Sequence, residues 1–228
     1  MPQTAIAIFL ATICFLVYHF ISSSEKTGAF FKKRAGSEQG QIYWVLFNRL
    51  LGATLFSMPV TYFIVFSNIQ ASDIGLVFRF NSQVYIALLV IGVLPVIINK
   101  YTAHKDGNLS MYPQIRASVW SKQLLVVSSL SWLCYLLGYE ILFRGFLFFF
   151  CLHEMSLLPA IAINISIYAL VHLPKGFNES MGSLFMGTIV CLLTYYSGSF
   201  WPAFILHSIL ALSNEWFSLK YHPNMSIK

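Results

Sequence analysis

Four ionisable residues, Glu140, Arg144, His172 and His207, lie inside or beside strongly apolar stretches of the sequence. A charged group in the hydrocarbon core of a membrane is energetically costly, so such a residue is a functional candidate by default. Histidine takes up and releases protons near neutral pH, and a buried glutamate can act as a general base. Donors beside them can stabilise an oxyanion. Together these residue types could activate a water molecule for hydrolysis.

Glu140 and Arg144 stand four residues apart, which puts them on one face of a helix with the acid before the base. This order favours an ion pair, and pairing lowers the cost of both charges in lipid. The alternative is a purely structural role, in which the buried ion pair only stabilises the packing of the helices. A lone membrane histidine is likewise more often a hydrogen-bonding residue than a catalyst. Two histidines and an ion pair on three separate segments favour chemistry instead.

The composition indicates a membrane protein. Of 228 residues, 57% are hydrophobic and only 10% are charged, whereas soluble domains carry roughly 25% charged residues. A soluble protein with a very large core is disfavoured because the apolar residues fall in runs long enough to span a bilayer. The net charge of +6 does not indicate nucleic-acid binding, because the basic residues sit in short loops and form no patch on a soluble face.

Seven apolar stretches can cross a bilayer, which takes about 17–25 helical residues each. They lie near residues 4–22, 44–66, 84–99, 122–150, 156–173, 180–197 and 200–217. We therefore expect an all-α fold, a polytopic transmembrane helical bundle of about seven spans with a polar site inside it. We expect the chain to form a single integral membrane domain over residues 1–228. Within it, residues 122–217 form the catalytic core that carries the motifs.

Basic residues alternate between the loops that join these spans. They gather in loops 23–43, 100–121 and 174–179 and in the C-terminal tail, whereas the intervening loops carry only Arg79. Loops rich in lysine and arginine face the cytoplasm. The pattern thus predicts a multi-pass protein with its N-terminus outside and its C-terminus in the cytoplasm. Arg49, near the start of the second span, is expected to snorkel to the interface.

The order of the polar residues resembles the CAAX-protease and bacteriocin-processing (CPBP, or ABI) family of intramembrane proteases, which includes the Ras-converting CAAX prenyl endopeptidases. Glu140-x-x-x-Arg144-Gly145 matches the family's first motif, and Tyr168-x-x-x-His172 matches its second. His207 stands where the family has its late histidine. The resemblance covers roughly 122–217, and the ordered set is far more specific than any single motif.

The resemblance implies an intramembrane endopeptidase (a hydrolase) of a bacterial-type cell membrane. Glu140, helped by His172, would activate the water that attacks the peptide bond. His207 would stabilise the oxyanion, and Arg144 would pair with Glu140. The substrate would be a peptide or a membrane-anchored protein segment that reaches the site from the cytoplasmic leaflet. The pattern specifies neither a prenylated substrate nor an oligomeric state.

Two positions depart from the family pattern. The family's first glutamate is Tyr139 here, and Ala211 stands where an asparagine or aspartate follows the late histidine. Tyr139 could donate a hydrogen bond to an oxyanion, and Asn214, two helical turns after His207, could replace the missing amide. Alternatively, the protein is a catalytically impaired member that acts as a membrane scaffold or a bacteriocin self-immunity factor. A transporter or proton relay built on the same charges is a third reading.

No cofactor is expected, because the resemblance points to a glutamate-dependent mechanism without metal. Zinc is the alternative, since it needs about three protein ligands and a water molecule. His172, His207 and Glu140 would supply those ligands, although the sequence has no His-Glu-x-x-His motif. The partners expected are the lipid bilayer and the peptide substrate, with no nucleic acid.

Overall fold

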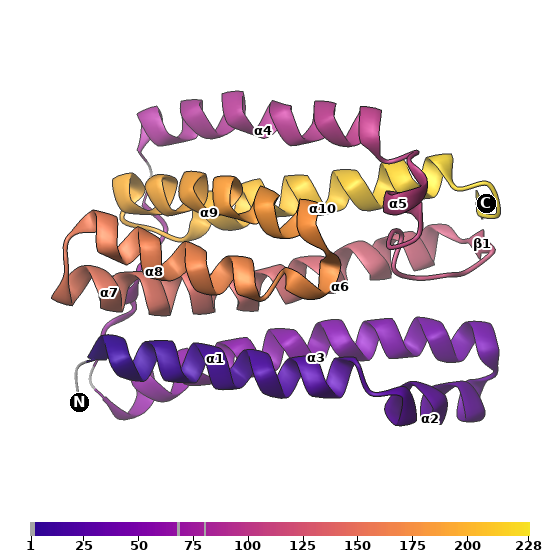
Figure 1. Ribbon diagram of the computed structural model, residues 1–228, viewed down its shortest axis with the longest axis horizontal. Helices are drawn as coiled ribbons and strands as arrows, with labels where there is room; N and C mark the ends of the chain where they lie inside the picture. The colour runs from indigo at the N-terminus through magenta and orange to yellow at the C-terminus, as the bar shows by residue number, and fades with distance from the viewer. Residues whose placement is uncertain (1–2, 68, 80) are drawn as a thin grey trace.

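The computed structural model describes residues 3–67, 69–79 and 81–228. Its helices run largely along one axis (Figure 1). The bundle consists of α1 (Gln3–Ser22), α3 (Ser37–Phe66), α4 (Ser82–Thr102), α6 (Lys122–Glu140), α7 (Phe148–Glu154), α8 (Leu157–Leu170), α9 (Phe177–Ser197) and α10 (Trp201–Tyr221). Shorter helical elements are α2 (Glu25–Ala35), η1 (Ala71–Ile74), α5 (Asp106–Leu109), η2 (Ile141–Leu147) and η3 (Leu173–Lys175). Two short strands, β1 (Val119–Trp120) and β2 (Ser226–Ile227), pair in parallel with Val119 opposite Ser226.

Five stretches within the described residues are long and apolar enough to cross a membrane. They are Gln3–Ser22, Ser37–Phe66, Ser82–Thr102, Lys122–Glu154 and Phe177–Ser197. The apolar helix α8 is shorter, at 14 residues, and α10 lies outside this group. The predicted all-α membrane fold is therefore confirmed, while the number of seven spans stays a prediction.

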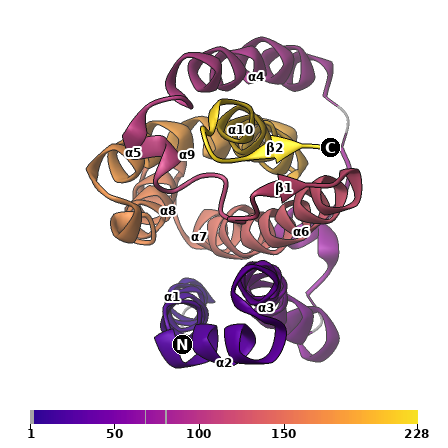
Figure 2. The ribbon, with the colours of Figure 1, turned by 90° about the vertical axis from the view of Figure 1, so that its right-hand side faces the viewer.

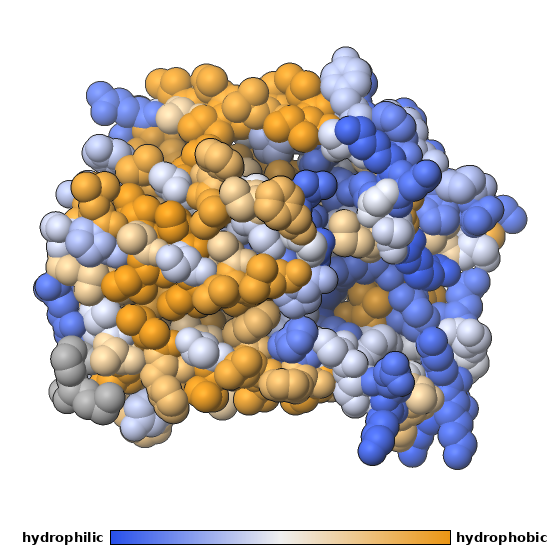
Figure 3. Space-filling model, in the orientation of Figure 1, coloured by the Kyte–Doolittle hydropathy of each residue, from blue (hydrophilic) through white to orange (hydrophobic). Residues whose placement is uncertain are grey.

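On the face seen in Figure 3, the surface of the bundle is apolar along most of its length, and most of the hydrophilic residues gather at one end. That end carries α2, α5, β1 and the C-terminus (Figure 1). Large apolar side chains such as Phe9, Leu89 and Phe185 point outward from three different helices. Exposed apolar patches of this extent would be unfavourable in water and match a hydrocarbon surround.

The predicted 23–43 loop is largely helical, which corrects the sequence-based expectation. Ser24 caps α2 by accepting a hydrogen bond from the backbone N–H of Thr27. Gly36, at a φ of 83°, then turns the chain into α3. Gly40 lets the two helices touch, because a Cβ there would lie 2.5 Å from the Cα of Lys32. The stretch lacks a long apolar run, and a hydropathy pattern shows only apolar runs. The pattern therefore predicts a loop where the chain forms a polar helical hairpin.

The core of the bundle is the continuous segment from α6 through η2 into α7. Its side chains Phe143, Phe146, Leu147 and Phe150 are fully buried. A Cβ on Gly138 would lie 2.6 Å from the carbonyl oxygen of Ala53, so glycine permits the close crossing of α6 and α3. The element that carries Glu140 and Arg144 is therefore surrounded by protein.

The last hairpin places His207 opposite this core. Helix α9 ends at Ser197 and is followed by Gly198, whose φ of 64° is left-handed and favours glycine. Pro202 stands in the first turn of α10, where its missing N–H costs no helical hydrogen bond. Helix α10 then runs beside α4, α6 and α9.

Candidate active site

Glu140 stands where the α-helical geometry of α6 gives way to the π-helical turn η2. Such turns are rare and frequently mark functional sites. Asn164 of α8 donates a hydrogen bond of 2.7 Å to the backbone carbonyl of Phe143, inside the turn. This contact ties α8 to the turn and helps to fix the direction in which Glu140 and Arg144 point.

Glu140 and Arg144 form the ion pair that their spacing predicts. Nη1 of Arg144 lies 3.3 Å from Oε2 of Glu140, and both side chains are 0% exposed. The guanidinium also lies over the ring of Tyr168, with Cζ 4.0 Å from the ring centroid. Gly187 of α9 leaves room for this ring, because a Cβ there would lie 3.2 Å from Cδ1 of Tyr168. Arg144 is therefore held between its carboxylate and an aromatic face.

His207 completes the contacts of Glu140. Its Nδ1 lies 2.5 Å from Oε1 of Glu140, and its side chain is 12% exposed. Since a carboxylate only accepts, the imidazole donates this hydrogen bond through Nδ1. Nη1 of Arg144 donates a longer hydrogen bond, of 3.5 Å, to the same Oε1. Oε2 lies within ion-pair distance of Arg144 but has no hydrogen bond among the described residues.

His172 lies in the turn after α8 and is 8% exposed. Its Nδ1 is 2.7 Å from the backbone carbonyl oxygen of Tyr168. A carbonyl can only accept, so Nδ1 carries the proton, and in the neutral ring Nε2 keeps a free lone pair. This is the protonation state that a general base requires.

Two tyrosines join the histidines into one cluster. The Tyr139 ring centroid lies 5.7 Å from that of His207 and 6.5 Å from that of His172. Tyr168 lies 4.6 Å from His172 and 6.3 Å from His207, centroid to centroid. Within the described residues, the hydroxyl of Tyr139 is buried without a hydrogen-bond partner. A buried unpaired donor is costly in a folded protein, so it marks a place where a ligand atom could bind.

Asn214 does not join this cluster. It is half-buried on α10, and it makes no hydrogen bond to the site residues in the described part of the chain. Ala211, one turn after His207, packs beside Trp132 and Leu136 of α6 and beside Tyr112. The place of the missing amide is therefore filled by apolar side chains.

A second buried ion pair lies nearer the hydrophilic end. Arg49, expected to snorkel, is instead 2% exposed, with Nη2 3.2 Å from Oε1 of Glu215, also 2% exposed. Ser128 and Ser131 accept from its Nη1, Gln114 accepts from its Nε, and the guanidinium lies over Trp132 at 4.3 Å. The expectation was wrong because Glu215, 166 positions further along the chain, supplies a partner that the local sequence does not reveal.

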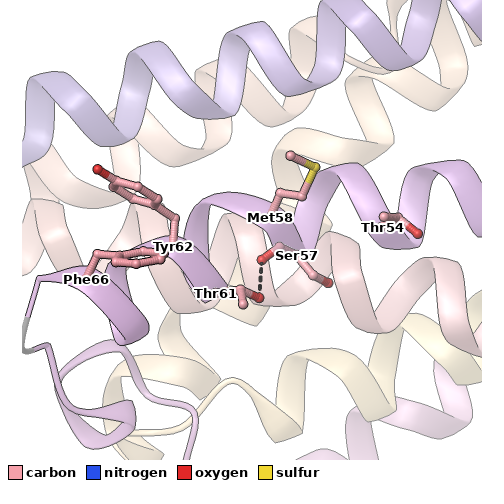
Figure 4. Close-up of a pocket in the computed structure, with 6 residues that line it drawn as sticks. All are labelled: Thr54, Ser57, Met58, Thr61, Tyr62 and Phe66. Atoms are coloured by element: carbon pink, nitrogen blue, oxygen red, sulfur yellow. Dashed lines mark hydrogen bonds between the residues drawn. The ribbon is translucent and has the colours of Figure 1, made fainter.

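A pocket of about 370 Å³ on the outer face of α3 is separate from these residues (Figure 4). Ser57 and Thr61 line it, but their hydroxyls donate to the helix's own carbonyls, at Ala53 and Ser57. Its other lining residues are Thr54, Met58, Tyr62 and Phe66. The six include no Asp, Glu, His, Lys, Arg or Cys, so no side chain in the pocket would activate a hydroxyl or a water molecule near neutral pH.

A zinc ion could bind the two histidines only through their Nε2 atoms. Nδ1 of His207 and Oε1 of Glu140 bind each other, and Nδ1 of His172 binds a carbonyl. Among the residues that the structure describes, no group of three or more His, Cys, Asp or Glu side chains is placed to hold a metal ion.

Comparison with known proteins agrees with the motifs. Residues 120–213 match the family model described as type II CAAX prenyl endopeptidase Rce1-like. This stretch contains every member of the cluster, from Tyr139 to His207. No curated protein and no solved structure matches the chain.

Proposed function

We propose that the protein is an intramembrane endopeptidase, because residues 120–213 match the family model of Rce1-like type II CAAX prenyl endopeptidases. The observation that supports this most strongly is the hydrogen-bonded group of Glu140, Arg144 and His207 beside His172, inside an apolar bundle. The substrate class is a peptide or a membrane-anchored protein segment. The basic end of the bundle faces the cytoplasm in this proposal, with the C-terminus inside.

In the proposed reaction His172 is the general base. Its Nε2 lone pair takes a proton from water, and the water oxygen bonds to the carbonyl carbon of the scissile peptide. Glu140 was the base expected from the sequence, but its Oε1 accepts hydrogen bonds from His207 and Arg144, and its Oε2 lies 3.3 Å from the Arg144 guanidinium, which favours the ionised carboxylate as a partner of both. The arrangement therefore gives Glu140 the role of orienting His207, as a carboxylate orients a histidine in hydrolytic triads.

His207 and Tyr139 are the proposed donors to the oxyanion. A carboxylate at Nδ1 stabilises a positively charged imidazole, so that Nε2–H can donate. The Tyr139 hydroxyl has its donor free. When the tetrahedral intermediate collapses, the C–N bond breaks and the leaving amine takes the proton from His172. The protons therefore balance without a metal.

The test is cleavage of a peptide library by the purified full-length protein in lipid vesicles. His207→Ala and Glu140→Ala should lower the rate by about 10²–10³-fold, as loss of an oxyanion donor does. His172→Ala should lower it by about 10²–10⁴-fold through loss of the base. Ser57→Ala, in the pocket on α3, is the matched control and should cut normally. Equal rates in all four variants would refute the site.

A second function is favoured by two specific residues, Tyr139 and Ala211, at the positions of the family's first glutamate and late amide. In this alternative the protein keeps the family fold but has lost turnover, and it acts as a membrane scaffold or a bacteriocin self-immunity factor. A folded wild-type protein that cleaves no member of the library would support it. Survival of a bacteriocin-resistance phenotype in His172→Ala and His207→Ala would support it further.

A further inference from the structure

Helix α2 differs from the long helices in direction. Viewed along the bundle, it lies across the ends of α1 and α3 (Figure 2). It stands at the hydrophilic end, where the apolar surface of the bundle stops (Figures 1 and 3). If the long helices cross a bilayer, α2 lies near the plane where headgroups meet the hydrocarbon.

The inner side of α2 is fixed to α3 by aromatic contacts. The ring of Phe31 lies 5.7 Å from Trp44 and 5.4 Å from Phe47, centroid to centroid. Gly28 approaches the same indole, because a Cβ there would lie 3.5 Å from Nε1 of Trp44. This helix is therefore a docked element of the fold, and its orientation is set by protein contacts.

The outer side of α2 combines a half-exposed aromatic ring with several cations. Phe30 is 51% exposed, and Cζ of Arg34 lies 4.9 Å above its ring. Lys32 and Lys33 are exposed beside it in the last turn. Within the described residues, no carboxylate lies within ion-pair distance of these three cations. With Lys26, the 11 residues of α2 carry four exposed positive charges and only one acidic residue, Glu25.

We propose that α2 is an interfacial helix that binds anionic lipid headgroups. Interfacial helices insert an apolar ring at the acyl boundary and use lysine and arginine to bind anionic lipid. Phe30 supplies the ring, and Lys32, Lys33 and Arg34 contact the headgroup phosphates. A small soluble anion would be bound by the positive charges alone. The exposed Phe30 ring therefore favours a lipid surface as the ligand.

The test is native mass spectrometry of the full-length protein with phosphatidylglycerol or phosphatidylcholine added to the detergent. Removing three surface cations should weaken retention of the anionic lipid by about 100-fold. The variant is Lys32→Gln, Lys33→Gln, Arg34→Gln. The matched control is Lys105→Gln, Lys122→Gln, Lys220→Gln, which changes the charge equally at the same end and should keep the lipid. Phe30→Ser should weaken retention of both lipids.

Two results would overturn the proposal. Equal loss of phosphatidylglycerol in both triple variants would show a diffuse attraction to the whole basic end. Displacement of the lipid by millimolar inorganic phosphate would show a simple anion site. Thermal unfolding of each variant in detergent verifies that α2 is still docked, since unfolding would itself remove the lipid. Peptide cleavage is not measured in this experiment. Its result therefore tests lipid binding independently of the proposed protease function.

Discussion

The two buried ion pairs of this protein differ in how completely their atoms are bonded. In the Arg49–Glu215 pair, every guanidinium nitrogen has an acceptor and both carboxylate oxygens are contacted. In the Glu140–Arg144 pair, Nε of Arg144 has no hydrogen bond, and neither does the adjacent Tyr139 hydroxyl, among the described residues. Both pairs are buried, so burial alone does not distinguish them.

The difference separates a structural site from a chemical one. A saturated pair has no donor or acceptor left for a substrate, and its bonds join α3, α6, α10 and the segment before β1. An unsaturated cluster carries a desolvation cost that a bound substrate or transition state would relieve. We therefore expect changes at Arg49 and Glu215 to act on stability and changes at the other cluster to act on turnover.

The largest expected effect is that of Glu215→Leu. It leaves the guanidinium of Arg49 buried without a countercharge, which costs about 3–5 kcal/mol in folding free energy. The measurement is the thermal unfolding midpoint in detergent, with cleavage assayed on the fraction that remains folded. A midpoint equal to that of the wild type would show that the pair is not a structural connection.

The double variant Arg49→Met, Glu215→Leu is the control for this effect. Replacing a whole buried ion pair by apolar side chains is often neutral or even stabilising, by about 1–4 kcal/mol. It should therefore restore the unfolding midpoint and keep cleavage. The corresponding Glu140→Leu, Arg144→Met double should also unfold near the wild-type midpoint but should not cut. Equal activity of the two doubles would contradict the distinction between the pairs.

The sequence predicts this contrast only in part. Long apolar runs predict the membrane helices, because length and hydropathy are local properties. The pairing of Glu140 with Arg144 is equally local, at one helical turn. The contact of His207 with Glu140 joins residues 67 positions apart, and only the family's motif order indicated it. Arg49 and Glu215 belong to no such motif, so their pairing could not be predicted.

Tyr139 tests whether an unpaired atom in the site has a role. Tyr139→Phe removes a hydroxyl that has no hydrogen-bond partner among the described residues, so stability should be unchanged or slightly higher. If the hydroxyl donates to the oxyanion, turnover should fall by about 10²-fold with little change in KM. The measurement is kcat and KM on the best peptide of the library. An unchanged kcat would leave His207 as the sole proposed donor.

Asn214 gives the smallest expected effect and tests the limits of the cluster. A residue seven positions after His207 lies about 10 Å further along the helix, and here it makes no bond to Glu140, His172 or Tyr139. Asn214→Ala should therefore change kcat by less than about twofold and the free energy of unfolding by less than about 0.5 kcal/mol, as changes away from bonded or tightly packed positions do. A large loss of kcat with a normal midpoint would mean that α10 rotates when substrate binds. The cluster described above would then be a resting arrangement, and Asn214 would replace the amide that Ala211 lacks.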